Sequence, residues 1–215
     1  MQIYVGSTRK LSFVKELEKR WIGRVNHPES RFAPYDGEKW IADNGAYSLW
    51  LQGKPFDEDR YLTYLEKLEL FFPKPQFAVL PDIVAKGTRS LDYSMHWLTS
   101  DRLPSWRWYL ALQDGMTPSD IDPVMNFIDG LFIGGTLGFK ALAKEWVELG
   151  NKYNKPVHYG RCGIHHRIND AYLAGCNSAD SAFPLWEKNR FMRFLTWVKE
   201  GHYDPESYKQ LFLDF

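Results

Sequence analysis

The chain has 215 residues, of which 44% are hydrophobic and 16% aromatic, so it can bury a sizeable core and is too apolar to be disordered. Its 27 basic and 27 acidic residues cancel, which excludes a protein that holds nucleic acid by overall positive charge; such a site must be a local basic patch. Cys162 and Cys176 form no CxxC and no zinc-type Cys/His cluster, so no metal or other cofactor is expected.

Targeting signals are not evident. Residues 1–4 enter a strand pattern at once, without a charged and then apolar leader, and no apolar run approaches membrane-spanning length. The adjacent His165 and His166 would not share a helix face, which argues against a metal pair. These patterns predict a cytoplasmic protein, in the host cytoplasm if a phage encodes it.

The apolar runs alternate with segments of helical spacing along the chain. Strands are expected at residues 3–5, 40–42, 77–80, 108–112, 130–133, 156–159 and 177–179. Helices are expected at 10–20, from Asp57 onward, at 88–100, from 117, at 139–149, at 164–174 with Gly175 closing it, at 187–199 and from 205. Residues 21–38 show no clear period.

This alternation predicts right-handed βαβ units around a parallel sheet, in a single domain over residues 1–215. Seven strands are one short of a (β/α)8 TIM-like barrel, so either the eighth lies within 21–38 or the barrel is incomplete. An open, doubly wound sheet is the alternative, but no GxGxxG turn follows the first strand. The barrel is the favoured fold.

Polar or glycine residues follow each expected strand. A barrel gathers the carboxyl ends of its strands at one face, where active sites are built. The residues placed there are Ser7, Asp43, Asp82, Gln113, Gly134, Gly135, Arg161 and Asp180. Each has a structural alternative, since an aspartate after a strand is often a helix N-cap and a glycine pair is often a tight turn.

Together these residues suit a planar base and a sugar. Asp82 and Gln113 fit the edge of a purine-like base, and Gly134 or Gly135 can offer a backbone N–H. Tyr47 can stack on the ring. Asp43 and Asp180 remain for chemistry, one as nucleophile and one as proton carrier, a pair suited to an oxocarbenium-like sugar centre.

Five motifs in order between Asp43 and Asp180 resemble the tRNA-guanine transglycosylase superfamily, and most closely the short DNA 7-deazaguanine transglycosylases of phages and bacteria. Residues 43–47, Asp-Asn-Gly-Ala-Tyr, are similar to the family's Asp-Ser-Gly-Gly-Tyr/Phe motif. Residues 77–82 resemble the strand that ends in its base-binding Asp, 113–115 its Gln-Gly-Gly, and 134–137 its Gly-Gly-Leu-Ala turn. Residues 158–180 resemble the unit that ends in its nucleophilic Asp.

The resemblance implies that guanine in DNA is exchanged for a 7-deazaguanine, such as the 7-cyano form, through a covalent aspartyl-glycosyl intermediate. Asp180 would attack C1′ and Asp43 would move the proton. Asp82, Gln113 and the Gly134–Gly135 backbone would read the base, with Tyr47 and Tyr159 stacking on its two faces. DNA, the free base and helper proteins are the implied partners. The tRNA enzymes are longer and carry a Cys3His zinc site that this chain lacks, and Asp114 and Ala46 replace family glycines.

A guanine must leave its stack to reach such a pocket, and basic residues near the strand ends can hold the phosphates around it. The candidates are Lys54, Lys86, Arg89, Arg161, Arg167, Lys188, Arg190 and Arg193. Three other functions remain open: a tRNA-guanine transglycosylase, a nucleoside N-glycosidase acting on a small substrate, and a non-catalytic nucleic-acid-binding barrel.

Overall fold

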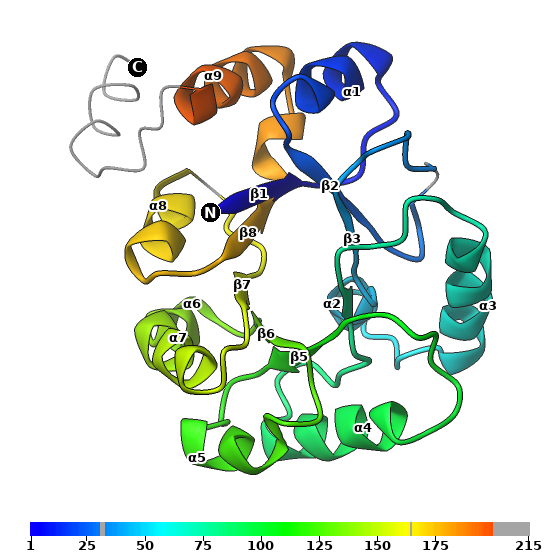
Figure 1. The fold of residues 1–215 in the computed structure, drawn as a ribbon, viewed down its shortest axis with the longest axis vertical. Helices are drawn as coiled ribbons and strands as arrows, with labels where there is room; N and C mark the ends of the chain where they lie inside the picture. The colour runs from blue at the N-terminus through cyan, green and yellow to red at the C-terminus, as the bar shows by residue number, and fades with distance from the viewer. Residues whose placement is uncertain (31–32, 164, 200–215) are drawn as a thin grey trace.

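A computed structural model describes residues 1–30, 33–163 and 165–199, in which eight parallel strands close into a barrel in sequence order (Figure 1). The strands are β1 (Gln2–Val5), β2 (Gly23–Asn26), β3 (Trp40–Ala42), β4 (Ala78–Val79), β5 (Trp108–Leu112), β6 (Gly130–Ile133), β7 (Val157–Tyr159) and β8 (Ser178–Ser181). The TIM-like (β/α)8 barrel is confirmed, and the open sheet is wrong because β1 pairs with both β2 and β8. The eighth strand is β2, within residues 21–38.

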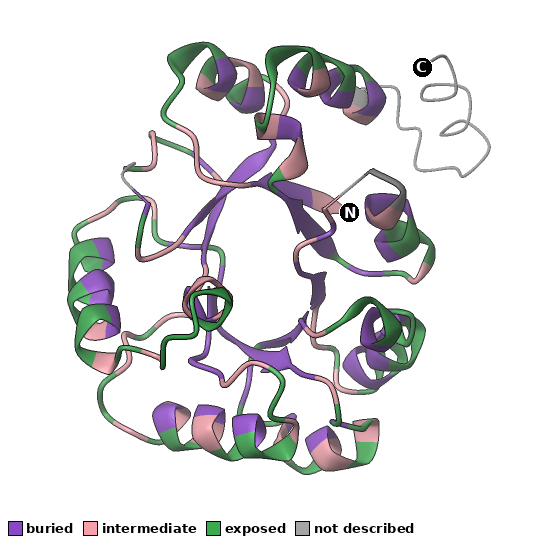
Figure 2. Cartoon of the chain, turned by 180° about the vertical axis from the view of Figure 1, so that it is seen from behind, coloured by how far each residue is buried: buried purple, intermediate pink, exposed green. Residues whose placement is uncertain are grey.

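Helices surround the barrel, with their buried faces turned toward the strands (Figure 2). They are α1 (Leu11–Glu18), α2 (Ala46–Leu51), α3 (Glu58–Glu69), α4 (Thr88–Leu98), α5 (Pro118–Ile121), α6 (Leu137–Lys140), α7 (Ala143–Lys152), α8 (His165–Leu173) and α9 (Lys188–Lys199), with 3-10 turns η1 (Asp122–Val124) and η2 (Phe183–Leu185). The helix α2 was not predicted, and the helix expected at 139–149 is divided between α6 and α7. The helix expected from 205 lies outside the described residues.

Two helix boundaries follow from local chemistry that the sequence indicated. The Asp57 carboxylate caps α3 by accepting the backbone N–H of Arg60 at 3.0 Å. Gly175 ends α8 with φ at +88°, where the Cys176 N–H reaches back to the Ala171 carbonyl at 3.0 Å. Both predicted boundaries are confirmed. At Gly175, the left-handed residue after the last turn allows the next N–H to bond a carbonyl that the helix leaves open.

Side chains alternate across each strand, so the barrel has an inner and an outer core. The inner core consists of Tyr4, Val25, Ile41, Phe77, Val79, Tyr109, Ala111 and Phe132. The rings of Phe77 and Tyr109 stack inside the barrel at 3.8 Å. The larger outer core lies between strands and helices and includes the fully buried Trp40, Trp97 and Trp146. The interior is therefore a packed layer on which residues at the strand ends rest.

Strand β2, which shows no apolar run in the sequence, carries a buried ion pair. Arg24 is 3% exposed, and its guanidinium binds both carboxylate oxygens of Glu38 at 2.5 and 2.6 Å. It also donates to the Thr8 carbonyl at 2.7 Å. Because this charge is paired, the arginine can occupy an outer-core position that a strand usually gives to an apolar residue.

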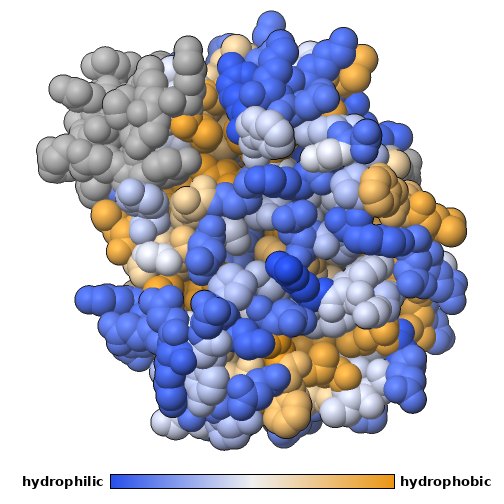
Figure 3. Space-filling view, viewed as in Figure 1, coloured by the Kyte–Doolittle hydropathy of each residue, from blue (hydrophilic) through white to orange (hydrophobic). Residues whose placement is uncertain are grey.

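The two faces of the barrel differ in what covers them. The helix α2 follows β3 and crosses in front of the barrel in Figure 2, so that view looks onto the carboxyl ends of the strands. Figure 3 shows the opposite face, which is mostly hydrophilic with separate apolar patches. No helix in the described part of the chain is both long and apolar enough to cross a membrane.

Candidate active site at the carboxyl ends of the strands

A cavity of about 330 Å³, counting the space that is open to solvent, lies at the carboxyl ends of the strands. Its walls are Asp43, Asn44, Tyr47, Val79, Asp82, Val84, Ala111, Gln113, Phe132, Gly134 and Arg161. Strand alternation accounts for two of its polar groups, because Asp43 is two residues beyond the inward-facing Ile41 and Gln113 two beyond Ala111. The structure thus brings together four predicted base-site residues, Asp82, Gln113, Gly134 and Tyr47. Ser7 is not part of the wall.

The Asp82 carboxylate is the centre of the polar wall. Its Oδ1 accepts from the Asn44 side-chain amide at 2.7 Å, and its Oδ2 accepts from the Gln113 amide at 2.5 Å. Burial raises the pKa of Asp82 to about 6 against the lowering effect of the Asn44 hydrogen bond, and the negative charge of Asp43 adds to the rise. The carboxylate is therefore oriented by two amides before any base enters.

Asn44 is a site residue that sequence reasoning did not single out. Its amide nitrogen also donates to the Leu80 carbonyl at 2.6 Å, and its oxygen accepts the Ala46 N–H at 2.8 Å. Every polar atom of this buried side chain is engaged, so its orientation is fixed. The signal was its place directly after Asp43 at a strand end.

Asp180 lies in β8, one residue before the strand ends, rather than after a strand that ends at 179 as expected. It does not line the cavity, but its charge acts on Asp43. Its Oδ1 accepts from His158 Nε2 at 3.0 Å and from the Arg161 backbone N–H at 2.8 Å. Although burial opposes ionisation, the hydrogen bond and charge of His158 and the Arg161 N–H prevail, and the pKa of Asp180 is lowered.

The pKa of Asp43 moves in the opposite direction. Burial raises it most, the Gly45 N–H bonded to Oδ1 at 2.7 Å lowers it, and the negative charge of Asp180 raises it again. His27 and Arg161 lower it through their charge, but the pKa remains raised overall. The pKa values of two neighbouring carboxyl groups are thus driven apart, so that Asp43 holds a proton more readily than Asp180 does.

Tyr47 and Arg161 meet over the cavity. The Arg161 guanidinium lies 3.4 Å from the centre of the Tyr47 ring, and Trp50 stacks beside Tyr47 at 5.7 Å. Arg161 has φ at +50°, an uncommon conformation for a non-glycine residue. Lys140 stabilises this turn by donating a hydrogen bond to the Gly160 carbonyl at 2.5 Å. Tyr47 is at the cavity as expected, with one face covered by an arginine.

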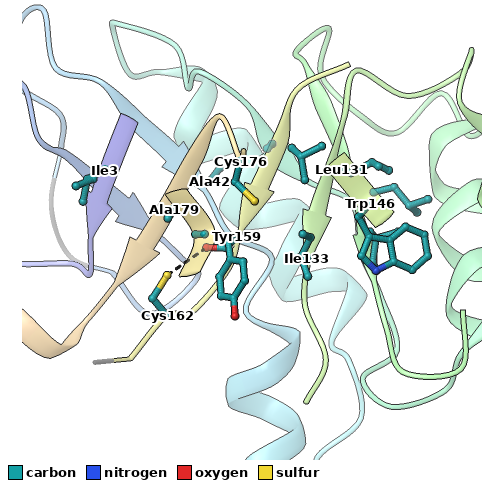
Figure 4. Close-up of a cluster of buried hydrophobic side chains, with 14 of the residues drawn as sticks. Ile3, Ala42, Leu131, Ile133, Trp146, Tyr159, Cys162, Cys176 and Ala179 are labelled. Atoms are coloured by element: carbon teal, nitrogen blue, oxygen red, sulfur yellow. Dashed lines mark hydrogen bonds between the residues drawn. The ribbon is translucent and has the colours of Figure 1, made fainter. Parts of the chain in front are cut away.

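Two predicted base contacts need correction. Tyr159 points away from the cavity into the outer core, beside Cys162 and Ile133 (Figure 4). The cause is alternation along β7, which turns His158 into the barrel and its neighbour Tyr159 outward. The Gly134 N–H is already bonded to the Leu112 carbonyl at 3.0 Å, so Gly134 supplies a wall rather than a donor.

Gly135 and Asp114 shape the turn beside that wall. Gly135 has φ at +69°, and a Cβ there would lie 2.6 Å from the Asp114 carboxylate. Asp114 accepts the Thr136 N–H at 2.8 Å and also bonds the Thr136 hydroxyl. Asp114 thus ties the turn after β5 to the turn after β6.

Six of the predicted phosphate-binding residues follow three strands, on the side of the barrel that carries the cavity. Lys86 and Arg89 follow β4, Arg161 and Arg167 follow β7, and Lys188 and Arg190 follow β8. Lys86, Arg89 and Lys188 are exposed, whereas Arg167 bonds the Cys162 carbonyl at 3.3 Å. Arg190 pairs with Glu187 at 3.2 Å and covers the Phe183 ring at 4.8 Å. Only Arg161 among them touches the cavity.

No protein-family model and no curated protein matches this chain. Within residues 1–30, 33–163 and 165–199, no group of three His, Cys, Asp or Glu side chains could hold a metal ion. Function is therefore inferred from the geometry of the two carboxylates and of the polar cavity beside them.

Proposed function

We propose that this protein is a glycosyltransferase that exchanges guanine in DNA for a 7-deazaguanine, such as 7-cyano-7-deazaguanine. The observation that carries the proposal is the opposed pair at the barrel mouth, with the pKa of Asp43 raised and that of Asp180 lowered. One group of such a pair suits proton transfer and the other suits nucleophilic attack. The motif resemblance assigns the same two roles.

In the first half-reaction, an ionised Asp180 oxygen forms a bond to C1′ as the bond from C1′ to guanine N9 breaks. The electron pair of that bond leaves with guanine, which takes the proton from Asp43. In the second half-reaction, Asp43 accepts the N9 proton of the entering base as N9 attacks C1′ and the aspartyl ester breaks. Each residue ends as it began, so the exchange needs no other reactant.

Base selection would fall to Asp82 and Gln113. Asp82 presents carboxylate lone pairs to the N–H and amino groups of a guanine edge, and Gln113 has a second amide hydrogen for a carbonyl oxygen. Since Asn44 already orients Asp82, the base meets a prepared acceptor. The Tyr47 ring becomes available for stacking when Arg161 moves aside, and Arg161 then suits a DNA phosphate.

The choice of DNA rests on the motif resemblance, so the assay offers tRNA as a second acceptor. Radiolabelled guanine is incubated with each nucleic acid and with wild type, Asp180→Asn or Asp43→Asn. We expect label in DNA with wild type, none with Asp180→Asn, and at least a 10²-fold slower exchange with Asp43→Asn.

Label in tRNA alone would keep the mechanism and overturn the substrate. Guanine released without label entering nucleic acid would indicate an N-glycosidase. Binding of DNA with neither exchange nor release, by a folded protein supplied with its helper proteins, would leave the non-catalytic barrel and refute the proposal.

A further inference from the structure

His158 is a buried polar residue to which the motif resemblance assigns no role, and it does not line the cavity. Its side chain is 0% exposed and lies inside the barrel, where it stacks on Phe132 at 4.8 Å and meets the edge of Phe77 at 5.2 Å. A histidine in such an apolar layer is costly unless both ring nitrogens are bonded. Here both nitrogens have partners.

Each ring nitrogen of His158 has one hydrogen-bond partner, and both partners lie on β8. Nδ1 lies 2.8 Å from the Ser178 hydroxyl, and Nε2 lies 3.0 Å from Asp180 Oδ1. An ionised carboxylate only accepts hydrogen bonds, so Nε2 must carry the hydrogen. Nδ1 is bonded to the Ser178 hydroxyl, so Ser178, His158 and Asp180 form one hydrogen-bonded chain.

Both donors to Asp180 converge on the same oxygen. Oδ1 receives the His158 Nε2–H and the Arg161 backbone N–H, while no described residue donates to Oδ2. Two bonds to one oxygen fix the rotation of the carboxylate and leave the second oxygen with its lone pairs free. The orientation of Asp180 is thus set from inside the barrel.

We infer that His158 is a positioning residue that holds Asp180 by Oδ1 and so makes Oδ2 the atom that attacks the sugar. This inference rests on the proposed function. As the Oδ2–C1′ bond forms and the C1′–N9 bond breaks, Oδ1 becomes the carbonyl oxygen of the ester and keeps its two donors. His158 gives up no proton in this step. It acts through Asp180 alone.

Among the described residues that face His158, only Asp180 carries a charge. The groups facing the ring are Ser178 and Asp180 on β8, Tyr4 on β1, Phe77 on β4 and Phe132 on β6. Burial raises the pKa of Tyr4, which keeps that hydroxyl neutral. Removing the imidazole therefore raises the pKa of Asp180, because the group that favours its ionised form is lost.

The test compares His158→Phe, which keeps a ring without a donor, with His158→Gln, which keeps an N–H donor. Full-length variants are mixed with guanine-containing DNA and quenched in acid, and the glycosyl-enzyme is measured by mass spectrometry. For His158→Phe we expect formation to slow on the order of 10²-fold, the cost of a misplaced reacting group. The KM for free guanine should stay unchanged, because His158 does not line the cavity. The acid limb of the rate profile should move to higher pH, and His158→Gln should recover much of the rate.

The outcomes separate the inference from the proposed function. No adduct with wild type would remove the proposed function and this inference with it. Adduct formation at the wild-type rate and pH dependence by folded His158→Phe would overturn the inference alone. If that variant does not fold, Ser178→Ala decides, since it frees the ring without emptying the core. Unchanged rate and pH profile in Ser178→Ala would then refute the positioning chain, and a slower rate with a shifted acid limb would support it.

Discussion

The difference in stability between Asp82→Asn and wild type should favour the variant more at neutral pH than at acid pH. The same substitution should weaken binding of the base. Asp82 is 4% exposed, and its pKa rises from 3.8 to about 6 on folding. A carboxyl whose folded pKa is raised contributes stability that is fully present below pH 3.8. That contribution is lost as the pH rises through 6, because the unfolded chain releases the proton first.

The magnitude follows from the shift of about two pKa units, each worth about 1.4 kcal/mol. Between about pH 4 and pH 7.5 the wild type should lose about 2.5 kcal/mol of unfolding free energy through this group. Asp82→Asn does not titrate, so its stability relative to wild type should increase by that amount over the same range. The change in hydrogen bonds to Asn44 and Gln113 gives an offset that does not depend on pH.

Urea unfolding at several pH values measures this difference directly, and the exposed Asp36→Asn is the matched control for removal of one negative charge. Exchange activity of Asp82→Asn should fall, since the amide presents a donor where guanine needs an acceptor. A stability difference between Asp82→Asn and wild type that stays constant from pH 4 to 7.5 would refute the reasoning. So would a difference that shrinks as the pH rises.

Three further variants test other parts of the structure. Glu38→Gln leaves Arg24 buried without its counter-charge and should lower the unfolding free energy by about 3–5 kcal/mol in urea; a loss below 1 kcal/mol would contradict a buried pair. Gly134→Ala places a Cβ 2.7 Å from a carbonyl of β5, so it should destabilise by about 1–3 kcal/mol and raise the KM for guanine, whereas normal kinetics would contradict the close packing. Arg161→Gln should weaken DNA binding and reduce the dependence of log K on log salt by about 1, and an unchanged slope would remove Arg161 from the phosphate contacts.

The sequence determined the alternation of strands and helices and therefore the barrel. Runs such as 77–80 and 108–112 are apolar throughout, as strands buried on both faces must be. The sequence also predicted that Asp43 and Gln113 would stand at the carboxyl ends, because each directly follows an expected strand, and the structure shows that both face the cavity. The sequence also predicted the helix caps at Asp57 and Gly175, because the hydrogen bonds of a cap join residues only a few positions apart.

Features that depend on distant partners required the tertiary structure. Strand β2 has no apolar run, and Arg24 is tolerated there only because Glu38, fourteen residues away, folds back onto it. Tyr159 was expected at the cavity because it is an aromatic residue at a strand end, but the register of β7 turns it outward.

The same register turns His158 inward, where β8 supplies Ser178 and Asp180 from twenty residues or more along the chain. Sequence spacing fixes which side of a strand a residue takes once the register is known. Which oxygen of a carboxylate is held, and which is free to react, is decided only when neighbouring strands bring their donors together, because hydrogen bonds depend on the distance and direction between atoms of different strands.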